Sequence, residues 1–246
     1  MSKLKKQRQS LIGFSFFLLF CLFLSGYFFL NSAFFNLREI EVRGCQLADE
    51  QAIEKLSGLT KGTNLFKINK REIIAGVELH PLIKTVHLTR RIPHTVILEI
   101  EERLPFAILV GEGEYLVVDV EGVCLKQVED LQEFNLPLIS GLTVPAELTL
   151  GEELTEAGLG VALELLNSLE EGFLAEIAEI DASTPYNLTL KMLQGVVINF
   201  GSLEGIERKL QIIRELLFEN EELINRQTVE YIDLRYQSLP VIKRKN

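Results

Sequence analysis

The stretch TVHLTRRIPHTVILEIE, residues 85–101, contains two predicted β-strands joined by a turn. The first strand covers Thr85 to Ile92 and the second covers Thr95 to Glu101. In each strand apolar residues recur at every second position, a pattern typical of a strand with a buried face. The predicted inward-facing residues are Val86 and Leu88 in the first strand and Val96, Leu98 and Ile100 in the second. Pro93 and His94 form the turn, so the stretch predicts a β-hairpin.

The residues before this hairpin predict one further strand and two helices. Leu37 to Val42 alternates between apolar and polar residues, which indicates a half-buried strand. Asp49 is a suitable cap for a short helix that ends at Gly58. Asn69, followed three residues later by Glu72, predicts a capping box at the start of a second helix. The order β-α-α-β-β predicts a small module that can fold by itself.

The residues after the hairpin predict a second domain that is rich in β-strands. The predicted strands are residues 106–110, 115–120, 123–128, 175–181, 187–193, 196–200, 229–235 and 240–243. Residues 155–169 predict a helix, and Ser202 is the expected cap of a long amphipathic helix. Pro137 and Pro145 bracket a predicted loop. The chain is therefore predicted to be α+β, with a β-rich mixed domain and flanking helices.

An apolar stretch near the amino terminus predicts a single transmembrane helix. No charged residue lies between Arg8 and Arg38, and Leu11 to Leu30 is long enough to cross a bilayer. A secretory signal peptide is the alternative, but its apolar region is shorter, about 7–15 residues, and ends in a small-residue cleavage site. We therefore expect a cytoplasmic tail at residues 1–10 and an uncleaved helix at residues 11–31.

The charge distribution predicts the orientation of this helix. The first ten residues carry four basic side chains and no acidic one, whereas residues 31–246 carry 35 acidic and 21 basic side chains, a net charge of −14. By the positive-inside rule the amino terminus is cytoplasmic and the remaining chain is extracytoplasmic. The acidic outer region argues against a nucleic-acid partner, because it repels phosphate. The anchor argues against a cytosolic enzyme.

Five short motifs follow one another along the chain. They are GTNLF at 62–66, HP at 80–81 with RRIPHT at 90–95, ERLP at 102–105, VDVEG at 118–122 and IDLRY at 232–236. Each is weak alone, but five in this order, covering nearly the whole chain, are specific. Together with the basic tail, the apolar helix and the module that begins at Phe35, they resemble the FtsQ/DivIB family of bacterial cell-division proteins.

This resemblance implies a POTRA domain at residues 35–103 and an FtsQ-type β domain at residues 104–243. It implies a scaffold of the divisome with no enzymatic activity, cofactor, metal or small-molecule substrate. The expected partners are the single-pass division proteins FtsB (DivIC) and FtsL, bound outside the membrane at the division septum. Through them the protein would help to regulate septal peptidoglycan synthesis.

The resemblance also implies where the partner binds. In the family the partner adds a strand to the edge of the last part of the β domain, and a sheet edge suits this because its backbone groups are unpaired. Carried over by position, the surface includes Asp233, Arg235, Tyr236, Val241 and Ile242. Asp233 either pairs with Arg235 or serves the partner, and Pro240 shortens any ladder there because it lacks an N–H. Lys243 to Lys245 is interpreted as a solvated tail, or else as a surface for an acidic partner or an anionic wall polymer.

Other interpretations of the sequence are weaker. His80, His87 and His94 share a spacing of seven, but prolines between them break the helix that would align them as metal ligands. Glu99 and Glu101 lie on the solvent face of a strand, so a membrane-anchored wall hydrolase is not favoured. A secretion or outer-membrane assembly factor with tandem POTRA modules is disfavoured because this chain has one module. A disulfide between Cys45 and Cys124 is possible.

Overall fold

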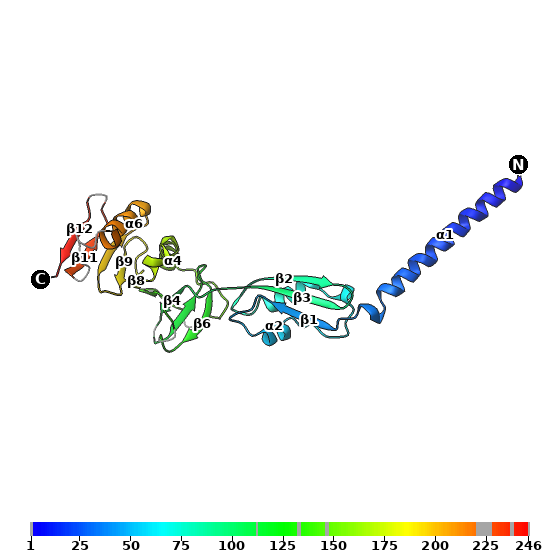
Figure 1. Ribbon diagram of the computed structural model, residues 1–246, viewed down its shortest axis with the longest axis horizontal. Helices are drawn as coiled ribbons and strands as arrows, with labels where there is room; N and C mark the ends of the chain where they lie inside the picture. The colour runs from blue at the N-terminus through cyan, green and yellow to red at the C-terminus, as the bar shows by residue number, and fades with distance from the viewer. Residues whose placement is uncertain are drawn as a thin grey trace. The chain divides into compact units, whose positions relative to one another are not determined.

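The computed structural model describes residues 2–111, 113–131, 134–145, 148–219, 228–236 and 239–245. The chain divides into two compact units, Met1–Glu102 and Arg103–Asn246. The first unit begins with helix α1, Ser2–Leu30, whose side chains are described from Phe14 onward (Figure 1). Within the described residues, no helix meets both the length and the apolarity that crossing a membrane requires.

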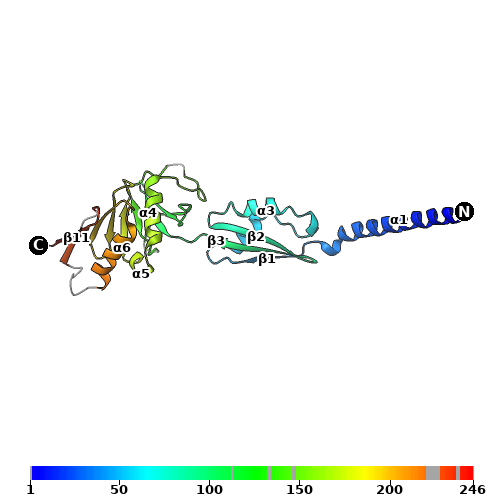
Figure 2. The same ribbon diagram turned by 90° about the horizontal axis from the view of Figure 1, so that it is seen from above.

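The remainder of the first unit is a three-stranded sheet with two helices. Its elements are the 3-10 turn η1 (Ala33–Phe35), β1 (Glu39–Arg43), α2 (Glu50–Leu56), the 3-10 turn η2 (Leu65–Lys67), α3 (Lys70–Val77), β2 (Ile83–Arg91) and β3 (Thr95–Glu102). The strand order is β1-β3-β2, with β1 parallel and β2 antiparallel to β3. The predicted β-α-α-β-β order is confirmed, and Figure 2 shows α3 lying over the sheet.

Local polar contacts explain where the two helices of this unit begin. The Asp49 side chain accepts a hydrogen bond from the Gln51 N–H, and the Asn69 side chain accepts one from the Arg71 N–H. The capping box differs from its prediction in one contact, because Asn69 Nδ2 donates directly to the Glu72 carboxylate at 2.6 Å. The helices then bury apolar residues against the inward face of the hairpin. The fully enclosed members of this core include Ile53, Leu65, Val77, Val96 and Leu98.

The second unit is built on a nine-stranded mixed sheet. Its strands are β4 (Ala107–Val110), β5 (Tyr115–Val118), β6 (Cys124–Val128), β7 (Leu138–Ser140), β8 (Ile177–Asp181), β9 (Leu188–Met192), β10 (Val197–Gly201), β11 (Val229–Asp233) and β12 (Val241–Arg244). Their order is β12-β11-β10-β9-β8-β7-β4-β5-β6. The helices are α4 (Ala157–Ser168), the short α5 (Glu171–Leu174) and α6 (Ile206–Arg214), which continues into a π-helical turn at Glu215–Glu219. Helices α4 and α6 share the core of the sheet (Figure 1).

Two predictions for this unit were wrong. The region between Pro137 and Pro145 contains β7, which pairs in parallel with both β4 and β8 at the centre of the sheet. The cap of α6 is Gly205, in the left-handed conformation with φ of 66°, rather than Ser202. The strand predicted at residues 229–235 is confirmed but ends two residues earlier, at Asp233, so Leu234 and Arg235 follow it.

Two charged residues next to the unit boundary are each bonded within their own unit. The Glu102 carboxylate accepts hydrogen bonds from three successive backbone N–H groups, those of Gln46, Leu47 and Ala48, at 2.8–3.1 Å. Partial burial acts to raise the pKa of Glu102, but these donors outweigh it and the pKa is lowered. Arg103 Nη1 contacts Asp119 at 2.6 Å in the second unit. Both charged residues of the ERLP motif, Glu102 and Arg103, therefore have structural roles.

Asp119 organises the turn between β5 and β6. Its side chain is almost fully buried and accepts hydrogen bonds from the N–H groups of Glu121 and Val123, both at 2.9 Å. Arg103 neutralises its charge, since a carboxylate at this depth requires a partner. The VDVEG motif is thus a turn held by a buried carboxylate.

Cys45 and Cys124 are free thiols, and burial raises the pKa of both.

Candidate partner-binding edge

Strand β12 forms one border of the nine-stranded sheet. It pairs antiparallel with β11, so that Asp233 lies opposite Val241 and Ile232 lies opposite Ile242. In the part of the chain that the structure describes, no backbone hydrogen bond reaches the other side of β12. At the opposite border, the start of β6 is covered, because Cys124 exchanges backbone hydrogen bonds with residues 151–152 at 2.7 and 2.9 Å. β12 is therefore a border strand with an unpaired outer side, whereas β6 is covered at its start.

The hydrogen-bonding pattern indicates which donors of β12 face outward. The Lys245 N–H donates to the Thr228 carbonyl at 2.7 Å, toward β11. Because successive N–H groups of a strand point to opposite sides, the N–H groups of Val241 and Lys243 also face β11. Those of Ile242 and Arg244 consequently face away from the sheet. An added strand would find these two donors and the carbonyls beside them.

Asp233 and Arg235 form a two-pronged ion pair at the end of β11. Arg235 Nε lies 3.0 Å and Nη2 lies 2.6 Å from the Asp233 carboxylate, and the Arg235 backbone N–H also donates to it at 3.1 Å. The hydrogen bonds from the Arg235 side chain lower the pKa of Asp233 despite its partial burial. The Asp233 side chain is only 10% exposed, whereas that of Arg235 is 41% exposed. Asp233 therefore orients Arg235, and Arg235 is the member that solvent reaches.

Large apolar side chains beside this ion pair are exposed. Tyr236 is 68% exposed, Leu239 is 85% exposed and Val241 is 54% exposed, whereas Ile242 packs partly into the core. The Arg235 guanidinium lies 5.8 Å from the centre of the Tyr236 ring. Exposed apolar groups at a sheet edge are typical of an interaction surface.

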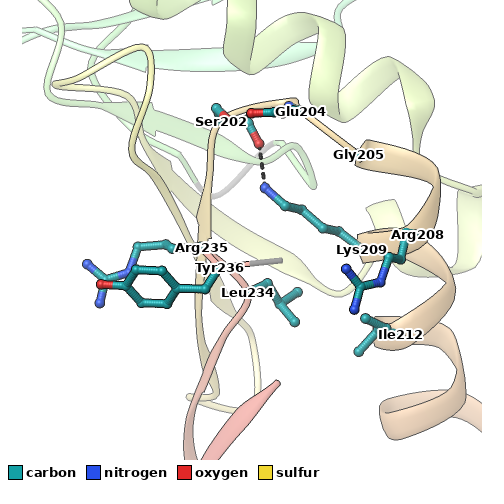
Figure 3. Close-up of a pocket in the computed structure, with 9 residues that line it drawn as sticks. All are labelled: Ser202, Glu204, Gly205, Arg208, Lys209, Ile212, Leu234, Arg235 and Tyr236. Atoms are coloured by element: carbon teal, nitrogen blue, oxygen red, sulfur yellow. Dashed lines mark hydrogen bonds between the residues drawn. The ribbon is translucent and has the colours of Figure 1, made fainter. Parts of the chain in front are cut away.

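A pocket of about 300 Å³ adjoins the residues that follow β11. Its lining comes from the Gly-containing turn after β10, from α6 and from residues 234–236: Ser202, Glu204, Gly205, Arg208, Lys209, Ile212, Leu234, Arg235 and Tyr236. Figure 3 shows Leu234 on the side of α6, while the side chains of Arg235 and Tyr236 project away from that helix. The pocket thus lies between α6 and residues 234–236, which follow β11.

Lys209 closes the inner side of this pocket. Its Nζ donates to the carbonyls of Phe200 at 2.9 Å and Ser202 at 2.8 Å, and it lies 4.8 Å from the centre of the Phe200 ring (Figure 3). Burial lowers the pKa of Lys209, and the negative charge of Glu204 acts in the opposite direction. Lys209 therefore stabilises the turn between β10 and α6, and residues of this turn line the pocket.

Gly201 permits close packing between β10 and the residues after β11. Its φ is 76°, and a Cβ atom added there would lie 3.1 Å from Arg235 Cγ. A side chain at this position would strain the backbone and press on the arginine. The sequence carries no sign of this contact, because the two residues are far apart along the chain.

The structure brings the five predicted partner-binding residues to one region of the sheet. Asp233 and Val241 are opposed, Ile242 follows in β12, and Arg235 and Tyr236 lie in the connection between the strands rather than in the ladder. The predicted basic tail is also revised, since its first two residues belong to β12. Sequence reasoning missed the α6 side of the pocket, although the polar positions of that amphipathic helix were a usable signal. The described residues contain no group of three or more potential metal ligands.

Comparison with known proteins assigns both units. Residues 35–103 match the POTRA domain of FtsQ type, and residues 107–235 match the C-terminal domain of the cell division protein FtsQ/DivIB. The second match alone spans more than half of the 246 residues.

The chain belongs to the FtsQ/DivIB family of cell division proteins. It is 29% identical over 216 residues to the cell division protein FtsQ of Geobacter sp. (strain M21), covering 85% of this chain and 76% of that protein. It is 22% identical over 215 residues to the cell division protein DivIB of Clostridium tetani, covering 85% and 79%. A solved structure of the extracytoplasmic domain of DivIB from Geobacillus stearothermophilus gives 12% identity and a TM-score of 0.34, covering 51% of this chain and 97% of that one.

The match to the FtsQ/DivIB C-terminal domain ends at Arg235. The ion pair of Asp233 with Arg235 is therefore inside the matched range, whereas Tyr236 and β12 follow it. The match to the family therefore does not extend to β12, and the properties of this edge follow from the residues of this chain.

Proposed function

We propose that this FtsQ/DivIB-family protein is a non-enzymatic scaffold of the divisome that binds FtsB/DivIC-like and FtsL-like single-pass proteins outside the membrane. Through this binding it helps to regulate septal peptidoglycan synthesis. The observation that carries the proposal is the unpaired outer side of β12 at the border of the nine-stranded sheet. The partner adds a strand along β12 and places side chains over the exposed residues that precede it.

Backbone pairing supplies affinity at such an edge, and the side chains around it supply specificity. The described charges on this surface are the cations Arg208, Lys209, Arg235, Lys243 and Arg244 and the acidic residues Glu204, Glu230 and Asp233. Arg235 pairs with Asp233, and Lys243 pairs with Glu230. Arg244 has no ion-pair partner among the described residues, so its charge favours an acidic partner segment. Exposed Tyr236 is the natural anchor, because tyrosine is enriched among the residues that dominate binding energy.

We further propose that α1 anchors the protein in the cell membrane, with the amino terminus cytoplasmic and the two domains outside. The support is the uncharged stretch from Leu11 to Leu30 and the four basic residues that precede it. From Phe14 to Leu30 the large apolar side chains are exposed, and they surround the helix instead of forming one stripe. Such a helix requires an apolar environment on all sides.

The partner proposal is tested by measuring the affinity of the full-length chain for the outer segment of an FtsB/DivIC-like protein from the same organism. Tyr236→Asp places a charge on the proposed surface, and we expect the affinity to fall by about tenfold or more. Tyr186→Asp is the matched control, because Tyr186 is 81% exposed in the connection between β8 and β9. Equal affinities for the two variants, both folded by circular dichroism, would contradict the proposed edge.

The proposed role and the absence of catalysis have separate tests. A tagged copy of the full-length protein should concentrate at mid-cell during division, and a uniform distribution over the envelope would argue against the septal role. In a peptidoglycan zymogram the purified protein should give no lytic band. A band that survives repurification would overturn the non-enzymatic assignment.

A further inference from the structure

Three segments of the POTRA domain meet at the end where the chain arrives from α1. They are residues 31–38, residues 60–71 and residues 90–95. The Leu37 N–H donates to the Thr63 carbonyl at 2.8 Å, and the Arg38 N–H donates to the His94 carbonyl at 2.8 Å. Arg90 Nη2 donates to the Ile68 carbonyl at 2.8 Å, which joins the second and third segments. The three segments therefore form one continuous surface, here called the basic end.

The basic end has a charge opposite to that of the outer region as a whole. Its three segments contain no Asp or Glu, although residues 31–246 carry 35 acidic and 21 basic side chains. Its cations are Arg38, Lys61, Lys67, Lys70, Arg71, Arg90 and Arg91, and all seven are exposed. A third of all basic residues of the outer region therefore lie on one end of one domain.

Most of these charges are not used inside the protein. Arg91 pairs with Glu41 and, at 3.7 Å, with Glu39, and Arg90 bonds a backbone carbonyl. The other five cations have no ion-pair partner among the residues that the structure describes. Exposed like charges this close together repel one another, so an anionic ligand would relieve their repulsion.

Each of the three segments also exposes one large apolar side chain. Phe34 is 53% exposed, Phe66 is 46% exposed and Ile92 is 60% exposed. Phe35 connects the first two, since its ring centre lies 5.0 Å from that of Phe34 and 5.1 Å from that of Phe66. Cations interspersed with exposed apolar side chains are the composition of a surface that enters the headgroup region of a bilayer.

We propose that the basic end binds anionic phospholipid headgroups at the outer surface of the membrane. This proposal rests on the membrane anchor proposed above, because only residues 31–34 separate the end of α1 from the domain. Four residues span at most about 14 Å when fully extended, so the anchor keeps the basic end within reach of the bilayer. Apolar side chains favour a lipid surface over a soluble polyanion, which offers them no apolar environment.

The absence of tryptophan from the chain provides a clean probe. Ile92→Trp places a single tryptophan on the basic end, and Leu79→Trp places one after the far end of α3, where Leu79 is 76% exposed. Each full-length variant is mixed with vesicles of phosphatidylcholine carrying brominated acyl chains, with or without roughly one-third phosphatidylglycerol. Flotation of the vesicles reports anchoring, and bromine quenching of tryptophan reports contact with the bilayer.

We expect the tryptophan at position 92 to be quenched at least about threefold more than that at position 79 when phosphatidylglycerol is present. The charge reversals Lys61→Glu, Lys67→Glu and Arg71→Glu in the Ile92→Trp chain, or added salt, should remove this excess while the protein still floats. Excess quenching that depends on neither phosphatidylglycerol nor charge would overturn the proposal, since the tether alone would then explain it.

The remaining outcomes separate this proposal from the anchor. If the protein floats with both kinds of vesicle and position 92 is quenched no more than position 79, the anchor stands and the lipid surface is refuted. If the protein floats only with phosphatidylglycerol vesicles and salt releases it, the basic end is supported and the anchor is refuted. If it floats with neither, both proposals fail.

Discussion

Replacing Arg244 by proline should weaken partner binding while leaving the fold intact. Arg244 lies in the border strand β12, and the Lys245 N–H bonded to Thr228 places the Arg244 N–H on the outer, unpaired side. Arg244→Pro therefore removes one donor from the edge proposed to bind the partner and none that β11 uses. Proline is tolerated on edge strands for this reason.

The expected loss follows from the contact that is removed. One backbone hydrogen bond contributes a net of about 0.5–1.5 kcal/mol, which corresponds to a loss of roughly two- to tenfold in affinity. The proline ring also occupies space toward the incoming strand, so we expect the upper part of this range. Arg244→Ala is the matched control, because it removes the same charge and side chain but keeps the N–H.

The assay is titration of the FtsB/DivIC-like outer segment into each full-length variant, followed by urea unfolding of each. Lys243→Pro serves as the opposite control, since its N–H faces β11 and its loss should lower the unfolding midpoint. Equal affinities of Arg244→Pro and Arg244→Ala would refute strand addition along this part of β12. A midpoint for Arg244→Pro as low as that of Lys243→Pro would refute the assignment of outward donors.

Three further predictions concern residues that stabilise the two domains. Glu102→Gln should reduce the stability of the first domain by about 1–2 kcal/mol at neutral pH. Because the folded pKa of Glu102 is lowered, this difference is fully present above the ordinary value of 4.5 and should be lost in urea titrations as the pH falls from there through the lowered folded pKa. Asp119→Ala should cost about 3 kcal/mol in chemical denaturation, since two backbone N–H groups lose their buried acceptor and Arg103 keeps only Glu121, at 2.7 Å. Gly201→Ala should lower thermal stability by about 1–2 kcal/mol and weaken partner binding by displacing Arg235; an unchanged melting curve would contradict the packing argument.

The sequence predicted those elements whose pattern repeats several times within one segment. In the hairpin at residues 85–101 an apolar residue recurs at every second position, twice in the first strand and three times in the second, and both strands were correctly located. Strand β7 has only three residues between prolines, too few for a periodic signal, although Ile139 is fully buried. The cap of α6 was misplaced because Ser202 has the right chemistry, whereas the left-handed backbone at Gly205 is decided by the turn after β10.

The candidate edge was predicted only in part, because its properties come from residues that are distant in sequence. The pairing of Asp233 with Arg235 is local and could be anticipated two positions apart. The contribution of Lys209 depends on contacts with β10 carbonyls, and the tight packing of Gly201 depends on Arg235 across the sheet. That β12 is a border strand is a property of the order of all nine strands. No window of the sequence contains that information.

The composition of β12 disfavours its pairing with the same edge of a second copy. The strand has four residues and follows Pro240, which limits the length of any added ladder. Lys243 and Arg244 would meet the same charges in an antiparallel second copy, and like charges directly opposite one another are destabilising. An acidic partner strand would be attracted by these cations, whereas a second copy would be repelled by them. Lys243 already pairs with Glu230 at 2.9 Å. Under the proposed function, the edge would therefore select its occupant by charge as well as by backbone pairing, and Arg244 is the cation of β12 that has no ion-pair partner among the described residues.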